Sequence, residues 1–498
     1  MDVAALAAEN AKLRQENEDL SRQLAQLIEA LRLQIHRQFG ASSEQTPPEQ
    51  ARLFDEPGDE LEPEPEAPPP AASQPRRARR RGTRLSPDLP HVEVIHDLTD
   101  EEKRCSAHGC ELAPMGEEVS EQLEFIPAQV RVIKNIRKKY TCPACEGNVV
   151  TAKAPPQLIP KSMATPSLLA WIAVSKYADA LPLYRQCTIF ERIGFEADRT
   201  TLANWMITCG ERVQPLINLL SDRLREAPYL HLDETTVQVL NEPGREAQAK
   251  SWMWVSAAGP PGKRTVLFHY APSRGQAVAK ELLAGYRGAV MVDGYEGYDV
   301  ACRANGILRL GCWAHARRRF VEAQRLQPKG KSGKADQALA LINGLYAIER
   351  RLKDAGPEQR HETRQREAKP LLEKLHDWLE KTLPRTPPKT ALGKALNYLH
   401  GQWPRLIHYL DDGRWPIDNN PAENAIRPFT VGRKNWLFSH SVRGATAGAN
   451  LYSLIETAKG HGLEPMLYLN FVFKLLPSVD SVDGFEALLP ENFNHADL

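Results

Sequence analysis

The chain has 498 residues, and its 64 Lys and Arg against 63 Asp and Glu leave a formal net charge of +1. Hydrophobic residues make up 42% and charged residues 26%, a balance that excludes a wholly disordered or collagen-like chain. At ~150 residues per domain, this length predicts about three units.

The longest apolar runs are short. Leu168 to Val174 and Met466 to Leu476 fall below the ~20 residues that a membrane span needs. The first ten residues include Asp2 and Glu9 and do not resemble a signal peptide. We therefore expect a cytoplasmic protein, in which eight cysteines are reduced or metal-bound rather than disulfide-paired.

Residues 1–45 carry a heptad pattern. Leucines recur every seven residues at Leu6, Leu13, Leu20 and Leu27, and the other seam position includes asparagines. This pattern predicts a parallel coiled coil that forms a homodimer or part of a larger oligomer. The alternative is a single amphipathic helix packed on its own chain.

Residues 46–90 read as a linker. The segment is rich in proline, first among acidic residues and then among arginines from Arg76 to Arg84. Such a composition cannot bury enough apolar surface to fold. The arginine run either contacts nucleic acid phosphates or remains solvated.

Residues 91–155 contain two cysteine clusters. Cys142 and Cys145 have the two-residue spacing that suits a tetrahedral zinc, and Cys105 pairs with either Cys110 or His108. We therefore expect one structural Zn²⁺ held by a zinc ribbon; chance thiols are the alternative.

Residues 156–226 read as helices. The segment 181–193, a turn at Gly194 and a second helix from Asp198 have the layout of a helix-turn-helix, although any helical hairpin can produce it. The second helix would present Arg199, Thr200, Thr201 and Asn204 to a DNA groove.

Residues 227–325 change to strand periodicity. Runs from Tyr229, Lys250 and Thr265 predict a meander, and two further strands end at Val292 and in the segment Ile307 to Trp313, with helices before each. This order predicts a ribonuclease H-like α/β core within an α+β multidomain chain. It places Asp233 in the first strand and Asp293 after the fourth, as neighbours.

Two such carboxylates form half of a two-magnesium site for phosphoryl transfer, and a third acid should complete it. A helical insertion, 326–412, precedes the last part of the core, 413–462, and a C-terminal tail, 463–498. Glu423 lies in the first turn of a helix entered through Pro421, so it is the expected third ligand, with Asp418 as the rival.

Basic and aromatic residues surround these acids in the sequence. DNA phosphates could be held by Arg317, Arg318, Arg319, Arg427, Arg433 and Lys434. Trp313 and Trp436 either stack on an unpaired base or, as we favour, pack in the core. Cys312 and His315 either brace the active site or pair by chance, and we do not count them as metal ligands.

Four motifs carry a resemblance. HLDETTVQVL, VDGYEGY, GCWAHARRRF and DNNPAENAIRPF occur in this order, with a helical insertion before the last. They resemble transposases of the bacterial insertion-sequence-66 family, and the similarity covers nearly the whole chain. The first cysteine cluster departs from the family's regular CxxC, since this chain reads CSAHGC.

The resemblance implies a DDE transposase with Asp233, Asp293 and Glu423 as its acidic triad and two Mg²⁺ or Mn²⁺ ions as cofactors. It implies DNA as partner, both terminal inverted repeats and target, two small accessory proteins of the same element, and action at the bacterial nucleoid. A structure-selective nuclease or resolvase of the same fold and a catalytically inactive DNA-binding regulator are the alternatives.

Overall fold

The computed structural model describes residues 130–141, 149–327 and 332–493, together with Glu9, Lys12 and Gln15. These three isolated residues are helical and exposed. The rest of the expected coiled coil, the linker and the four cysteines of the expected zinc site lie outside the described residues. Within the described ranges, no helix is both long and apolar enough to cross a bilayer.

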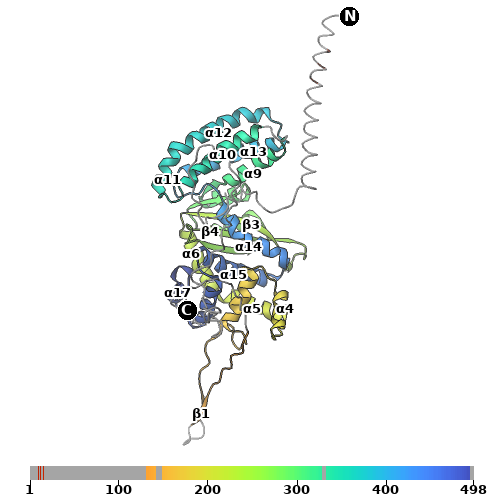
Figure 1. The fold of residues 1–498 in the computed structure, drawn as a ribbon, viewed down its shortest axis with the longest axis vertical. Coiled ribbons are helices and arrows are strands. Elements are labelled where there is room, and N and C mark those ends of the chain that lie inside the picture. Colours follow the sequence, from red (N-terminus) through yellow and green to blue (C-terminus); the bar gives the residue numbers. More distant parts are fainter. Residues whose placement is uncertain are drawn as a thin grey trace, which may run out of the picture. The chain divides into compact units, whose positions relative to one another are not determined.

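A mixed six-stranded sheet forms the centre of the fold (Figure 1). Its main path runs β5-β4-β3-β6-β7, and β8 pairs with the carboxyl end of β3. β3, β4 and β5 pair antiparallel, whereas β6 and β7 run parallel to β3. The strands are β3 Tyr229–Asn241, β4 Lys250–Ala258, β5 Thr265–Ala271, β6 Ala289–Val292, β7 Leu308–Gly311 and β8 Ser439–Ser441. The predicted meander and the two later strands are confirmed.

Helices cover both faces of this sheet. One face packs through Val255 and Phe268 against apolar side chains of α14 and α15, and the other packs through Trp254 against α7 and α8. The helices of these layers are α6 Gln214–Glu226, α7 Gln276–Leu282, α8 Gly297–Asn305, α14 Asn420–Trp436 and α15 Val442–Gly460; α9 Trp313–Arg325 follows β7. A sheet buried on both sides explains why β6 is a continuous apolar run and why β4 buries side chains on both of its faces.

Helix α15 also closes the outer edge of β5. The β5 backbone amide of Phe268 donates to Ser453 Oγ at 2.8 Å, and that of Val266 donates to Thr457 Oγ1 at 3.0 Å. The same threonine hydroxyl donates back to the Val266 carbonyl at 2.9 Å. Side chains of a helix therefore satisfy backbone groups that an edge strand would otherwise leave to solvent.

The predicted pair of helices before the sheet is confirmed as α4 Leu183–Arg192 and α5 Arg199–Arg212, which follow α3 Pro166–Tyr177. Gly194 in the turn has φ +86°, a conformation that favours glycine. Asp198 caps α5, because its carboxylate accepts from the amides of Thr200 and Thr201 at 2.9 and 3.1 Å. Before them, β1 Lys139–Thr141 and β2 Val149–Thr151 form an antiparallel pair.

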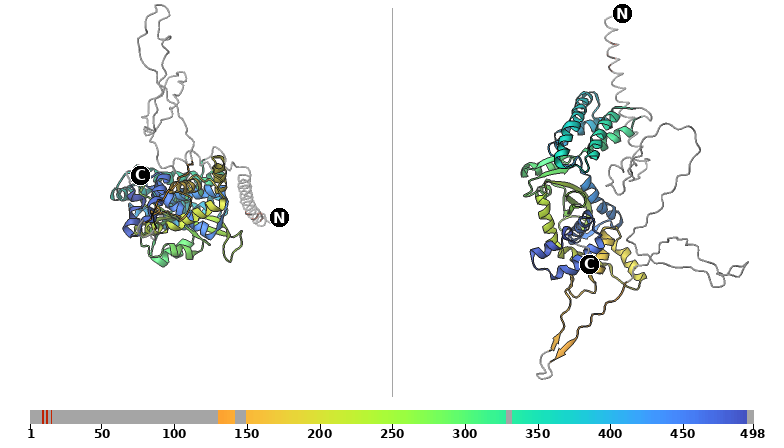
Figure 2. Two further views of the ribbon diagram at one scale, coloured as in Figure 1. Left: turned by 90° about the horizontal axis from the view of Figure 1, so that it is seen from below. Right: turned by 60° about the vertical axis from the view of Figure 1, so that its left-hand side comes forward.

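The expected insertion is helical. Figure 1 labels its helices beside α9, Figure 2 shows the same blue-green group from two other sides, and α10 and α13 contact α9 directly. The helices are α10 Lys334–Arg351, α11 Pro357–Thr363, α12 Lys369–Thr382 and α13 Ala391–Leu406. Because α13 also packs on β7, the insertion contacts the β7 edge of the sheet.

The segment expected as a C-terminal tail contains packed helices, α16 Pro465–Leu475 and α17 Val482–Ala487. Tyr468, Leu469 and Phe473 of α16 are fully buried, and this helix packs against α3. The apolar run that is too short for a membrane span thus serves as core.

Candidate active site

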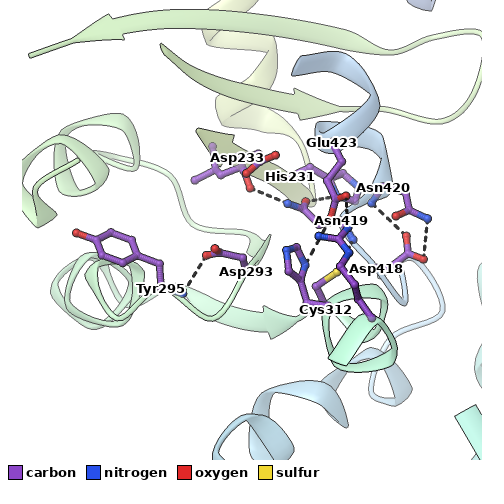
Figure 3. A network of polar contacts seen from close by, with 12 residues as sticks. His231, Asp233, Asp293, Tyr295, Cys312, Asp418, Asn419, Asn420 and Glu423 are labelled. Atoms are coloured by element: carbon purple, nitrogen blue, oxygen red, sulfur yellow. Dashed lines mark hydrogen bonds and ion pairs between the residues drawn. The ribbon is translucent and has the colours of Figure 1, made fainter. Parts of the chain in front are cut away.

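The carboxylates of Asp233 and Asp293 lie at the same position along two neighbouring parallel strands, one within β3 and one directly after β6. In β3 and β6, His231 pairs with Met291. Continuing two residues along each strand places Asp233 opposite Asp293, which directly follows β6. Adjacent parallel strands present their carboxyl ends at one sheet edge, so these two acids meet there (Figure 3).

Strand alternation separates Asp233 from its neighbour Glu234, because successive side chains point to opposite faces. The Glu234 side chain is 2% exposed, accepts from the Tyr298 hydroxyl and pairs with the Arg274 guanidinium. Arg274 Nη2 also lies 3.5 Å from Asp293 Oδ2. Our sequence reasoning missed Glu234 and Arg274; the adjacent acids in HLDETT were the available signal.

Helix α14 delivers the third acid, Glu423, in its first turn. The residue before the helix, Asn419, is fully buried and fixes the helix to β3. Its Nδ2 donates to the Leu232 carbonyl at 2.8 Å, and its Oδ1 lies 3.0 Å from His231 Nδ1. Burial lowers the pKa of His231 to about 3, so its ring is neutral and this contact is a hydrogen bond. Asn419 therefore ties the start of α14 to the residue preceding Asp233.

The rival acid, Asp418, has a different set of partners. Its Oδ2 accepts from the Tyr346 hydroxyl and from Asn420 Nδ2, both at 3.0 Å, and its Oδ1 accepts from the Asn420 amide at 3.2 Å. The residue is 8% exposed, and burial raises its pKa to about 6. Figure 3 shows this carboxylate turned to Asn420. These contacts join the insertion to the start of α14, which favours Glu423 over Asp418 as the third acid.

The three acids share one electrostatic environment. The pKa of Asp233 is raised to about 8, first by burial and then by the negative charges of Glu234, Glu423 and Asp293. Arg318 Nη2 offsets part of this charge, 2.9 Å from Glu423 Oε2. Oxygen donors from β3, from the residue after β6 and from α14 fit the preference of Mg²⁺ for oxygen ligands. Their mutual repulsion is what a divalent cation would relieve.

The expected DNA-contacting residues of the core differ in their surroundings. Arg318, Arg319, Arg427 and Lys434 are exposed. Arg317 Nε donates to Asn343 of the insertion at 2.9 Å. The remaining member, Arg433, bends back onto β3.

Arg433 Nη1 donates to the Thr236 carbonyl and to the hydroxyls of Thr235 and Thr236 at 3.1 and 3.0 Å. Burial lowers its pKa. These bonds hold the far part of α14 against the sheet, so Arg433 has a structural role in addition to its charge.

The expected recognition residues Arg199, Thr201 and Asn204 are all exposed on α5. All three lie within the first six residues of the helix, at its amino-terminal end. This is the part of a recognition helix that normally meets base edges.

Both tryptophans pack in the core, as favoured. Trp313 is fully buried, and its Nε1 donates to the Leu406 carbonyl at 2.9 Å. Trp436 is half-buried and meets the Phe429 ring edge-on at 5.3 Å between centroids.

Comparison with known proteins gives the class. Residues 161–447, more than half of the chain, match the family described as Transposase IS66 family. The chain is therefore a transposase, a DNA-acting enzyme. Three further matches cover a zinc-finger binding domain of transposase IS66 at 102–146, an IS66 C-terminal element at 453–490, and Transposase C of IS166 homeodomain at 26–94. The chain belongs to the IS66 transposase family, as its motifs indicated.

Relatives of similar length occur in Sinorhizobium fredii. The uncharacterized protein y4qI is 33% identical over 99% of this chain and 93% of its own length. The uncharacterized protein y4jD is 34% identical over 82% of this chain and 81% of its own. The zinc-finger match covers Cys105, Cys110, Cys142 and Cys145, which suggests zinc binding there.

Proposed function

We propose that this transposase binds the terminal inverted repeats of an insertion sequence, cleaves DNA strands there and joins the freed 3′ hydroxyls to target DNA. Asp233, Asp293 and Glu423 form its catalytic triad, on a core that we assign to the ribonuclease H-like class. The observation that carries the proposal is the shared register of Asp233 and Asp293, with Glu423 close enough to raise the pKa of Asp233.

The acids fit a pair of Mg²⁺ or Mn²⁺ ions held by Asp233, Asp293 and Glu423. When bound, such ions supply an activated oxygen nucleophile and stabilise the leaving oxygen. The chain's part is to fix the carboxylates. Asp233 is held by the Glu234 amide at 2.9 Å and Asp293 by the Tyr295 amide at 2.9 Å, so each side chain has one oriented oxygen.

Cations of the protein would position the DNA backbone. Arg318 lies beside Glu423, and Arg427 follows Glu423 by four residues on the same face of α14. Guanidinium groups bind phosphate oxygens through paired, charge-assisted hydrogen bonds. In strand transfer, the 3′ oxygen forms a bond to target phosphorus, the target's phosphodiester bond breaks, and its 3′ oxygen leaves.

The remaining modules suit end recognition. Helices α4 and α5 form the proposed helix-turn-helix, residues 91–155 the zinc-binding unit, and residues 1–45 a dimerising zipper. The proposed domains keep the boundaries expected from the sequence. Two small accessory proteins of the same element and action at the bacterial nucleoid are further parts of this proposal.

The test uses near-isosteric variants of the full chain. Asp233→Asn, Asp293→Asn and Glu423→Gln should each abolish strand transfer while binding to inverted repeats persists. Glu322→Gln, an exposed acid on α9, is the matched control and should retain activity. Full strand transfer by any triad variant would remove that residue from the site. Cleavage without joining by the wild type would favour a nuclease, and binding without either reaction a regulator.

A further inference from the structure

A second group of possible metal ligands lies on the other side of Glu423. One ligand atom each of Cys312, His315 and Glu423 lies within 4.8 Å of the other two. Among the residues that the structure describes, this is the cluster whose ligand atoms are close enough to share a metal ion. Cys312 and His315 come from the start of α9, and Glu423 comes from the start of α14. Neither the family matches nor the proposed catalytic triad assigns a role to this cysteine and histidine.

Two atoms of the group are buried without a partner. His315 Nδ1 and Glu423 Oε1 are buried and make no hydrogen bond, although they lie only 3.5 Å apart. The other Glu423 oxygen, Oε2, is the one that Arg318 binds. Buried polar atoms normally have a hydrogen-bond partner, so two unpaired atoms that face each other indicate that a bound ion could contact both.

The geometry suits a tetrahedral metal. With bond lengths of about 2.0 to 2.1 Å to nitrogen and oxygen, two zinc ligands lie roughly 3.4 Å apart. The His315 to Glu423 distance of 3.5 Å agrees with this value. A thiolate, a neutral imidazole and a carboxylate would balance the charge of Zn²⁺ and leave a fourth position for water.

The group is also held rigidly. The Asn419 amide donates to Cys312 Sγ at 3.2 Å, and the Trp313 amide donates to the Ile417 carbonyl at 3.2 Å. These bonds join the starts of α9 and α14. An amide donating to sulfur is a supporting contact that suits a metal-bound thiolate.

From these observations we infer that Cys312, His315 and Glu423 form a Zn²⁺ site that competes with the catalytic ions for Glu423. Zinc displaces the thiol proton of Cys312 to solvent without any change in oxidation state. Mg²⁺ does not favour a thiolate, so the sulfur selects zinc. With Glu423 Oε1 bound to zinc and Oε2 held by Arg318, neither carboxylate oxygen is left for the catalytic ions, so zinc inhibits the enzyme; this consequence rests on the proposed function.

The site is tested with Co²⁺, a spectroscopic substitute for zinc, added to full-length protein that has been dialysed to remove exchangeable zinc but keeps its tightly bound zinc. The wild type should show a thiolate-to-cobalt absorption band that Cys312→Ser lacks. His315→Ala should weaken Co²⁺ affinity at least about tenfold. Cys302→Ser is the matched control, because Cys302 is a buried free thiol of α8 outside the group. Circular dichroism confirms folding of each variant. An unchanged band in Cys312→Ser, or no thiolate band in the wild type, overturns the site.

The inhibitory role has its own measurement. For each protein, the ratio of DNA cleavage with and without micromolar Zn²⁺ at fixed Mg²⁺ is compared. Zinc should suppress cleavage by the wild type and by Cys302→Ser at a concentration about tenfold below that needed for Cys312→Ser. Equal zinc sensitivity overturns the competition. If the wild type does not cleave DNA at all, the proposed function fails while the cobalt spectra still decide the site.

Discussion

Replacing Asp233 by asparagine should stabilise the magnesium-free protein at pH 8 and change little at pH 4. The native pKa of this carboxyl is raised from 3.8 to about 8 by burial and by the neighbouring acids. The native state therefore holds the proton more tightly than the unfolded chain does. Protons are released on unfolding across this interval, so stability falls as the pH rises from about 4 to about 8.

The magnitude follows from the size of the shift. About four pH units at about 1.4 kcal/mol each give roughly 5 kcal/mol at pH 8. Because the side chain keeps some contact with solvent, screening reduces this, and we expect about 2 to 3 kcal/mol. At pH 4 the native carboxyl is protonated and resembles asparagine, so the gain should be well below about 1 kcal/mol.

Thermal unfolding at both pH values, in buffer without added divalent metal, measures this difference. The Asp233→Asn variant should melt about 5 °C above the wild type at pH 8. Asp480→Asn, which changes an exposed carboxylate, should melt with the wild type at both pH values. No gain at pH 8, or an equal gain at pH 4, would refute the electrostatic reasoning.

Three further variants test packing, DNA contact and assembly. Gly210→Ala should destabilise the protein by more than about 2 kcal/mol, because the new Cβ would lie 2.5 Å from Ala447 Cα. Gly401→Ala, at a helical position with no atom within 4 Å of the new Cβ, should instead stabilise the protein by up to about 1 kcal/mol. Urea unfolding measures both changes. Arg199→Ala should weaken binding to inverted repeats more than binding to unrelated DNA in titrations at one salt concentration, and an equal loss for both DNAs would contradict a contact to base edges. Leu13→Pro should reduce the mass by light scattering to that of a monomer, and an unchanged mass would reject the zipper.

Strand periodicity made much of the sheet predictable. The runs of β-branched and aromatic residues predicted where β3, β4 and β5 begin. The predicted order of the strands then placed the acid in β3 beside the acid that follows β6. The roles of adjacent acids were harder to assign. Asp233 and Glu234 differ in the face of β3 on which they lie: Asp233 lies on the face toward α14, and Glu234 on the face toward α8. The contact between Arg274 and Glu234 is formed only in the folded protein.

Contacts between distant segments could not be read from the chain. The choice between Glu423 and Asp418 depends on Tyr346, which lies in the insertion and binds Asp418. The pairing of Cys312 and His315 with Glu423 likewise joins two helix starts more than a hundred residues apart. The packed α16 was expected as a tail, because a short apolar run does not reveal what covers it.

The closed edge of β5 limits how copies of this protein can associate. An open edge strand recruits strands from other chains through its unpaired backbone groups. Here the hydroxyls of Ser453 and Thr457 already occupy the amides of Phe268 and Val266. Continuous sheets across subunits are thus unfavourable at this edge, and any contact between copies here would have to be made by side chains.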